Sequence, residues 1–318
     1  AVQESIIEDP VFYGKAHVYQ AGKSHTGSVL LIHGIGENAA RDWDGLIPKL
    51  ARDYHVVTFD LPGFGRSSGG NKPYTPENYV AFVKFVADKY TKGPFVLIGP
   101  SMGGAVALRY AATYPDDVRG LVIADVPGIL HHQSYSQYLS HLGIGAVPSF
   151  YPNQKEHLHN LVGNLLGAVS RMQPDLDLVM ASPMLRDKVL DGNPAKIAGL
   201  ALVLEDFSGS IQRVRAPVLV IWGARDPIAP LRTGKVLAAN LAQAQLEILP
   251  ESAHTPMEDA SAEFDALVLA YVGRPAVQPY AQKLQLLEDS GAPASTREGS
   301  CKKQSGRVLE GDYASIVI

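Results

Sequence analysis

Residues Pro94 to Pro115 read PFVLIGPSMGGAVALRYAATYP, with one serine, Ser101, among the three glycines of GPSMGG. An apolar run precedes this serine, and an alanine-rich run follows it. Because glycine weakens both strands and helices, glycines gathered between two such runs indicate a turn that needs backbone freedom. The stretch therefore predicts a strand, a sharp turn at the serine, and a helix.

The pattern G-x-S-x-G between a strand and a helix is that of a nucleophile elbow, in which a strained turn projects the serine hydroxyl. Gly99 and Gly103 have no side chains to clash across such a turn, and Pro100 helps to end the strand before it. The helix N-terminus that follows offers unpaired N–H groups and a positive dipole end to a developing oxyanion. Ser101 is therefore the candidate nucleophile.

A serine hydroxyl needs a base, and that base needs an orienting acid. His254, in SAHTPMED, follows the apolar run LEILPES, and Asp226, in WGARDP, follows PVLVIWG. Nucleophile, acid and base in this chain order are typical of proteins with this elbow. We predict Ser101, Asp226 and His254 as catalytic residues. Asp125, which ends the run LVIAD, stays open as an alternative acid, because such triads are recognised by geometry.

Short apolar runs alternate along the chain with longer stretches of helical period. Buried strands without in–out alternation, separated by helices, predict a parallel sheet covered on both faces. We expect strands at 27–34, 55–60, 95–99, 118–128, 217–223 and 246–252, and helices at 42–53, 76–90, 102–115 and about 230–241. The alternating segment VFYGKAHVYQAG, residues 11–22, predicts an antiparallel hairpin or edge strand.

Taken together, the motifs HGIG (33–36), DLPGFGRSS (60–68), GPSMGG, WGARDP and the SAH loop resemble the α/β-hydrolase superfamily over about residues 5–273. The resemblance implies an α/β-hydrolase fold, with a mostly parallel central sheet flanked by helices and an inserted helical lid. The alternation of strands and helices is interrupted over residues 129–193, which we expect to form the lid, and residues 1–128 and 194–273 are expected to form the core.

The same resemblance assigns the oxyanion hole residue by residue. The backbone N–H groups of Met102, just after the nucleophile, and Ile35, after the His-Gly pair, are the expected donors. We expect His33 to brace that loop, and Asp60 and Arg66 to stabilise a turn rather than to do chemistry.

The expected lid is rich in aromatic residues and leucine. Tyr135, Tyr138, Phe150 and Tyr151 are candidates to wall an acyl pocket, although packing within a folded lid explains such residues equally well. Five histidines also lie in this segment, but those at 157 and 159 would not share one helical face. We therefore predict no metal site, and the chemistry expected of Ser101, His254 and Asp226 needs no cofactor.

Residues 274–318 lie beyond what a hydrolase core requires. Apolar residues alternate with Gly, Ser and Asp after Cys301, which is the texture of one coil of a parallel β-solenoid. This C-terminal extension is either the start of a truncated β-solenoid domain or an ordinary strand that packs on the hydrolase. Lys302 and Lys303 form too short a basic run to indicate nucleic-acid binding.

The composition of the chain argues against some classes of binding partner. The 318 residues are 46% hydrophobic and carry a net charge of −4, which gives no reason to expect nucleic acid or an anionic membrane surface. No apolar run is long enough for a membrane span, and the single cysteine rules out an internal disulfide. A processed N-terminus at Ala1 would fit a periplasmic or secreted protein, and an unprocessed one would fit the cytoplasm. Oligomeric state stays open.

These observations predict a serine hydrolase, similar to carboxylesterases and lipases, that cleaves esters of short to medium apolar acyl groups through an acyl-enzyme. Carbon–carbon bond hydrolysis, acyl transfer and perhydrolysis use the same three residues and stay open as alternatives. A non-catalytic binding module is the alternative from another class, since fold alone does not determine function. A serine at the elbow argues against the relatives that use an aspartate there.

Overall fold

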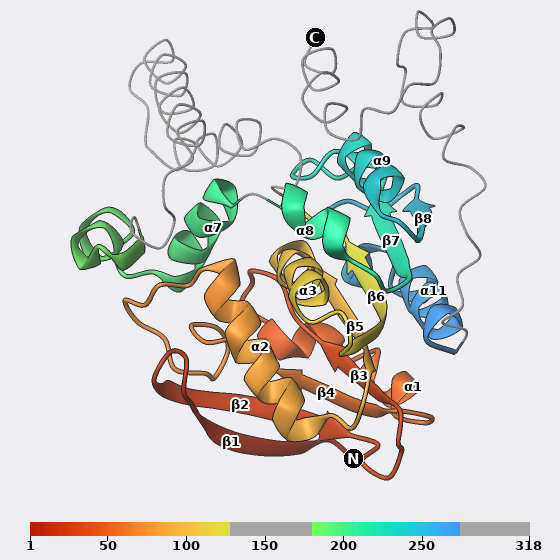
Figure 1. The fold of residues 1–318 in the computed structure, drawn as a ribbon, viewed down its shortest axis with the longest axis horizontal. Helices are drawn as coiled ribbons and strands as arrows, with labels where there is room; N and C mark the ends of the chain where they lie inside the picture. Colours follow the sequence, from red (N-terminus) through yellow and green to blue (C-terminus); the bar gives the residue numbers. More distant parts are fainter. Residues whose placement is uncertain (128–179, 206, 274–318) are drawn as a thin grey trace, which may run out of the picture. The chain divides into compact units, whose positions relative to one another are not determined.

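The computed structural model describes residues 1–127, 180–205 and 207–273. Within these ranges eight strands form one sheet in the order β1-β2-β4-β3-β5-β6-β7-β8 (Figure 1). The strands are β1 (Gln3–Asp9), β2 (Gly14–Ala21), β3 (Ser28–Leu31), β4 (His55–Phe59), β5 (Phe95–Pro100), β6 (Val118–Ala124), β7 (Val218–Gly223) and β8 (Ala244–Leu249). β2 runs antiparallel to both β1 and β4, and the remaining neighbours are parallel, which confirms the predicted α/β architecture. The antiparallel segment expected over 11–22 forms only β2, and its hairpin partner is β1, which the sequence analysis did not predict.

The parallel strands are buried on both faces, as their unbroken apolar runs require. In β5, Leu97 belongs to one hydrophobic core, while Val96 and Ile98 belong to the core on the opposite face. In β7, Val220 and Ile221 divide in the same way. Successive side chains of a strand point to opposite faces, so one apolar run supplies both cores.

Two groups of helices enclose these cores. The larger core takes buried residues from α2 (Pro76–Tyr90), α3 (Ser101–Thr113), α7 (Pro194–Leu204), α8 (Ser208–Arg213) and α9 (Leu231–Asn240). The smaller core takes them from the 3₁₀ helix η1 (Ala39–Trp43), α1 (Ile47–Leu50) and α11 (Ser261–Gly273), with Met257 of the short helix α10 (Pro256–Asp259) packed against it. The sheet is therefore covered on both sides, as predicted.

The limits of the helices follow from local chemistry. The side chain of Thr75 accepts a hydrogen bond from the backbone N–H of Asn78, and Pro76 occupies the first turn, so α2 begins where the sequence predicts. The expected single helix over 42–53 is wrong, because the structure divides this region into η1 and α1. Pro48 lies in the first turn of α1 and has no N–H to continue a longer helix.

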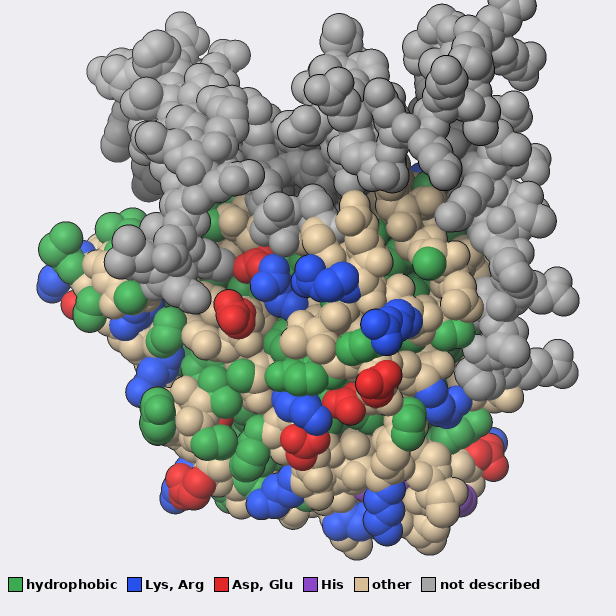
Figure 2. Space-filling view, viewed as in Figure 1, with side chains coloured by type: hydrophobic (Ala, Val, Ile, Leu, Met, Phe, Trp, Pro, Cys, Tyr) green, Lys and Arg blue, Asp and Glu red, His purple; other side chains and the backbone are tan. Residues whose placement is uncertain are grey.

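The surface carries charges of both signs. Figure 2 shows the face that α2 and α3 cover, where Lys and Arg side chains lie among Asp and Glu side chains. On α2, Lys84 Nζ lies 2.5 Å from Asp88 Oδ1 and 3.1 Å from Asp117 Oδ2. No helix in the described ranges is both long enough and apolar enough to cross a bilayer.

Only the last part of the predicted lid, residues 180–193, lies within the described residues. It contains a π-helical turn, η2 (Leu185–Val189), and contacts the loop that follows β4. Arg186 Nε donates to Asn71 Oδ1 over 2.7 Å, and Asn71 Nδ2 donates to the carbonyl of Pro183 over 3.3 Å. Residues 129–179 and the C-terminal extension 274–318 lie outside the described part, so the predicted domain division stays a prediction.

Candidate active site

The candidate residues meet at the carboxyl ends of the parallel strands, where ligands bind in open α/β sheets. His33 follows β3, Ser101 follows β5 and Asp125 follows β6. Asp226 lies in the loop after β7, and His254 lies in the loop after β8. Residues far apart in the sequence are thus brought to one edge of the sheet by the topology.

Ser101 stands on a strained turn between β5 and α3. Its φ is +48°, a left-handed conformation that is rare for a residue with a side chain. A β-carbon at Gly99 would lie 2.4 Å from the carbonyl oxygen of Gly103, and one at Gly103 would lie 2.5 Å from the carbonyl oxygen of His33. The glycines therefore permit the close backbone packing that holds the strained turn.

A continuous chain of hydrogen bonds links the three predicted catalytic residues. His254 Nε2 lies 2.9 Å from Ser101 Oγ, and His254 Nδ1 lies 2.8 Å from Asp226 Oδ2. An ionised carboxylate only accepts hydrogen bonds, so Nδ1 carries the proton and Nε2 is free to accept the serine hydroxyl. The arrangement can deprotonate Ser101.

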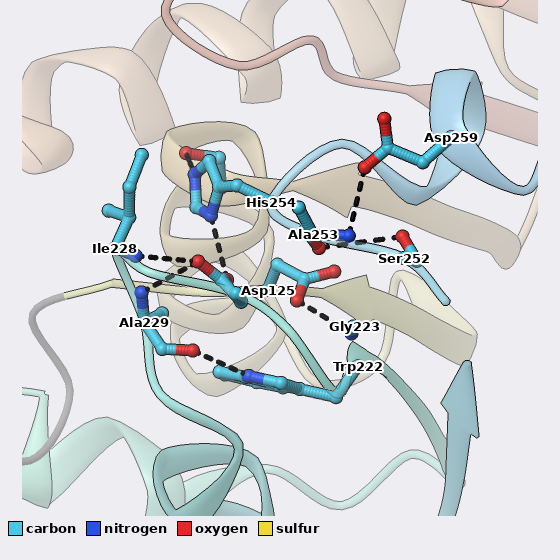
Figure 3. Close-up of polar contacts among 11 residues, drawn as sticks. Asp125, Trp222, Gly223, Ile228, Ala229, Ser252, Ala253, His254 and Asp259 are labelled. Carbon is cyan, nitrogen blue, oxygen red and sulfur yellow. Dashed lines mark hydrogen bonds and ion pairs between the residues drawn. The ribbon is translucent and has the colours of Figure 1, made fainter. Parts of the chain in front are cut away.

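The Asp226 carboxylate is held by its own loop. Its Oδ1 accepts hydrogen bonds from the backbone N–H groups of Ile228, at 2.7 Å, and Ala229, at 3.0 Å (Figure 3). The indole N–H of Trp222 donates to the carbonyl of Ala229 over 2.8 Å, which ties the loop back to β7. Oδ2 is left for His254, so the carboxylate orients the imidazole.

Two residues that the sequence analysis did not single out position the His254 loop. The backbone N–H of Ala253 donates to Asp259 Oδ2 over 2.9 Å (Figure 3). Gly223, the last residue of β7, allows that loop to come close, since a β-carbon there would lie 2.0 Å from the carbonyl oxygen of Ala253. The signal for Gly223 was its place at the end of an apolar strand, whereas nothing in the sequence marked Asp259.

The alternative acid, Asp125, does not contact His254 through any described hydrogen bond. Its side chain is fully buried, and its Oδ1 accepts from the backbone N–H of Gly223 over 2.8 Å. Burial raises the pKa of the Asp125 carboxyl far above its ordinary range, and the neighbouring Asp226 and Asp259 raise it further. The structure thus brings Asp226 to the imidazole, whereas Asp125 is hydrogen-bonded to Gly223.

The expected oxyanion donors belong to two backbone segments next to Ser101. Met102 is the second residue of α3, and the first N–H groups of a helix have no intrahelical acceptor. The loop of Ile35 reaches the serine through Gly34, where a β-carbon would lie 3.3 Å from Ser101 Cβ. Both predicted N–H groups therefore belong to backbone that is adjacent to the nucleophile.

His33 braces this loop from within the core. Its Nε2 accepts the backbone N–H of Leu61 at 2.9 Å, and its Nδ1 lies 2.6 Å from the carbonyl oxygen of Gly34. Burial lowers the pKa of His33 to about 4, so the ring is neutral with its proton on Nδ1. These contacts fit the bracing role that we expected.

Asp60 organises the neighbouring turn. Its Oδ2 accepts from the backbone N–H of Arg66 at 2.9 Å and from the hydroxyl of Tyr19 at 3.0 Å, and its Oδ1 accepts from Ala40 at 3.0 Å. The turn closes tightly, since a β-carbon at Gly65 would lie 2.5 Å from Asp60 Cγ. Asp60 and the backbone of Arg66 thus stabilise a turn, as expected.

The remaining predictions about the site concern the substrate pocket and metal binding. The pocket candidates Tyr135, Tyr138, Phe150 and Tyr151 lie outside the described residues, as do the five lid histidines. Within the described ranges, no group of three or more His, Cys, Asp or Glu side chains is placed to hold a metal ion.

A parallel sheet with helices on both faces, and with a serine, a histidine and an aspartate hydrogen-bonded at its strand ends, is the arrangement found in α/β hydrolases. Residues 27–261 match the family model described as the alpha/beta hydrolase fold. The chain therefore belongs to this family.

Its relatives include esterases and lipases. The chain is 29% identical over 254 residues to a pimeloyl-[acyl-carrier protein] methyl ester esterase of Neisseria meningitidis, covering 77% of this chain and 92% of that protein. It is 28% identical over 258 residues to Lipase 3 of a Moraxella species, covering 78% of each. A solved hydrolase structure from Pseudomonas aeruginosa superposes with a TM-score of 0.63 at 23% identity over 85% of this chain and 98% of that one, which shows the shared fold.

Proposed function

We propose that this protein is a serine hydrolase that cleaves carboxylic esters of apolar, short to medium acyl groups. The observation that carries the proposal is the hydrogen-bond chain from Asp226 through His254 to Ser101. The relatives described above, a methyl ester esterase and a lipase, favour esters over the other reactions that the same residues support. The acyl preference rests on the aromatic and leucine content of residues 129–193 and stays a prediction.

The reaction proceeds in two stages. Ser101 Oγ attacks the ester carbonyl carbon while its proton passes to His254 Nε2. The imidazolium gives this proton to the leaving alcohol oxygen as the carbon–oxygen bond breaks, which leaves an acyl group on Ser101. Water then attacks the acyl carbon, His254 accepts a proton from that water, and the proton returns to Ser101 Oγ as the acid departs.

Charge builds up on the carbonyl oxygen during both attacks. The N–H groups of Met102 and Ile35 stabilise that oxyanion, and removal of one such donor costs about 10²–10³ in kcat. Asp226 stabilises the imidazolium and keeps Nε2 facing the serine. The chemistry uses only side chains and backbone groups of the protein together with water.

Two measurements test the proposal. The first is hydrolysis of p-nitrophenyl esters from acetate to palmitate, with an amide and a diketone as comparison substrates. The second is labelling by a fluorophosphonate, which reacts with activated serines. We expect ester hydrolysis to exceed the other reactions and Ser101→Ala to abolish both signals. Ser24→Ala, at an exposed serine, is the matched control.

The contrary outcomes separate the alternatives. A faster reaction with the diketone than with every ester would replace ester hydrolysis by carbon–carbon bond hydrolysis. Absence of both labelling and turnover in the folded protein would favour a binding module.

A further inference from the structure

Two aspartates follow neighbouring strands of the sheet at the candidate site. Asp226 follows β7 and Asp125 follows β6, the neighbouring parallel strand. Both are buried, with 6% of Asp226 and none of Asp125 exposed to solvent. Two carboxylates that share a dry site cannot both stay ionised at low cost, because their charges repel and neither is solvated.

The hydrogen bonds indicate which of the two carboxyl groups is ionised. Asp226 receives three donors, since its Oδ1 accepts from Ile228 and Ala229 and its Oδ2 accepts from His254. This set stabilises an ionised carboxylate. Asp226 is therefore the charged member of the pair.

Asp125 has the opposite environment. Its Oδ1 accepts a single backbone N–H, that of Gly223 (Figure 3). Its buried Oδ2 receives no N–H or O–H from any group in the described part of the chain. A buried carboxylate oxygen without a donor is costly, whereas a protonated one is itself a donor and needs an acceptor. The Asp226 carboxylate, which interacts with Asp125 from the neighbouring strand end, is the candidate acceptor.

The surrounding charges favour the neutral form of Asp125. Two acidic groups raise the pKa of Asp125, namely Asp226, from the loop after β7, and Asp259, from α10. Together with complete burial they raise the pKa of Asp125, while the Gly223 N–H opposes them only in part. Geometry and electrostatics therefore agree on a carboxylic acid at this position.

We propose that Asp125 is a positioning residue whose neutral carboxyl shares its proton with the Asp226 carboxylate. The shared proton orients Asp226 and withdraws part of the negative charge that Asp226 presents to His254. Asp125 itself touches neither substrate nor the reacting atoms. Its effect on the reaction rests on the proposed function, whereas the carboxyl pair itself does not.

Infrared spectroscopy tests the pair independently of turnover. At neutral pH the protein should show the C=O stretching band of a buried protonated carboxylic acid, and this band should shift in deuterated buffer. Asp125→Asn should remove the band, and Ser101→Ala should retain it. Absence of the band from the wild-type protein, or its survival in folded Asp125→Asn, would overturn the proposal.

Enzyme kinetics test the consequence. Asp125→Asn keeps a side-chain N–H donor toward Asp226 and an oxygen toward Gly223, so kcat/KM should stay within about threefold of wild type. Asp125→Gly removes the donor, and because Asp125 has a φ of +47° the glycine adds no backbone strain. In that variant Asp226 presents its full charge to His254, and the acid limb of the kcat/KM profile should move up by about half to one pH unit.

Asp265→Ala removes another buried aspartate, paired with Lys49 on α1, and serves as the control for losing a buried carboxyl. Its pH profile should be unchanged. A loss of about 10³-fold or more in Asp125→Asn would instead make Asp125 the working acid and overturn the positioning role. A wild-type protein with the infrared band but with neither esterase activity nor fluorophosphonate labelling would refute the proposed function and leave the carboxyl pair standing.

Discussion

A β-carbon at Gly223 would lie 2.0 Å from the carbonyl oxygen of Ala253, the residue before His254. The last residue of β7 and the loop after β8 are thus packed backbone against backbone. The N–H of Arg225 also donates to the carbonyl of Ser252 over 3.0 Å, which fixes the same approach. The position of the candidate base therefore depends on the absence of a side chain at the end of the neighbouring strand.

Gly223→Ala should displace the His254 loop. The new methyl group faces backbone atoms that cannot rotate away, and a shift of about 1 Å at a catalytic group can cost about 100-fold in rate. We expect kcat/KM to fall by about 100-fold with a measurable loss of thermal stability. Gly45→Ala is the matched control, because a β-carbon there meets nothing within 4 Å. Equal activity in the two variants would mean that the loop tolerates the methyl group.

The Ser101–His254 pair should act as one unit. We expect Ser101→Ala and His254→Ala each to lower kcat by about 10⁴-fold or more. The kcat of the double variant should lie within about tenfold of that of the less active single variant. Each change removes the same proton transfer, so the losses do not add. Steady-state kinetics with the best ester of the panel measure this, and circular dichroism checks folding. Ser101→Ala with activity within about tenfold of wild type would rule out Ser101 as nucleophile.

His33 should make the protein less stable in mild acid. Its folded pKa of about 4 lies below the value near 6.5 of an unfolded histidine, so the unfolded chain binds a proton that the folded protein does not. The stability from this group is complete above about pH 6.5 and is lost as pH falls toward about 4, amounting to about 3 kcal/mol over that window. Urea unfolding of wild type and His33→Gln at several pH values measures the difference in slope, and parallel curves would contradict this account.

Much of this architecture could be predicted because the informative residues lie at strand ends. Ser101, Asp226 and His254 each follow an apolar run, and parallel strands present their carboxyl ends at one edge. The exact partner of His254 could not be predicted, since Asp125 and Asp226 follow adjacent strands. The hydrogen bond from His254 to Asp226 separates them, and the backbone donors of Ile228 and Ala229 that hold Asp226 in place depend on the folded loop.

Three other features could not be predicted from the sequence: the helix α7, the break between η1 and α1, and the role of Gly223. The segment PAKIAGLALVL of α7 is apolar nearly throughout, so it shows no helical alternation, and no helix was expected over 194–204. The break between η1 and α1 was missed because the apolar spacing continued through it. Gly223 has no reactive side chain, and its role follows only from the close packing of the loop after β8 against its backbone.

Asp125 should give the protein a stability that falls as the solution becomes more alkaline. Its folded pKa is raised, so above the ordinary aspartate value near 4 the folded protein keeps a proton that the unfolded chain has lost. The free energy of unfolding should therefore decrease by about 1.4 kcal/mol per pH unit from this group until the raised pKa is reached. Asp125→Asn carries no titrating proton and should lack that component. Urea denaturation of the two proteins from about pH 5 to about pH 8 should give curves that diverge, with Asp125→Asn relatively more stable at the alkaline end. Parallel curves would show that Asp125 is ionised in the folded protein and would remove the basis of the carboxyl pair.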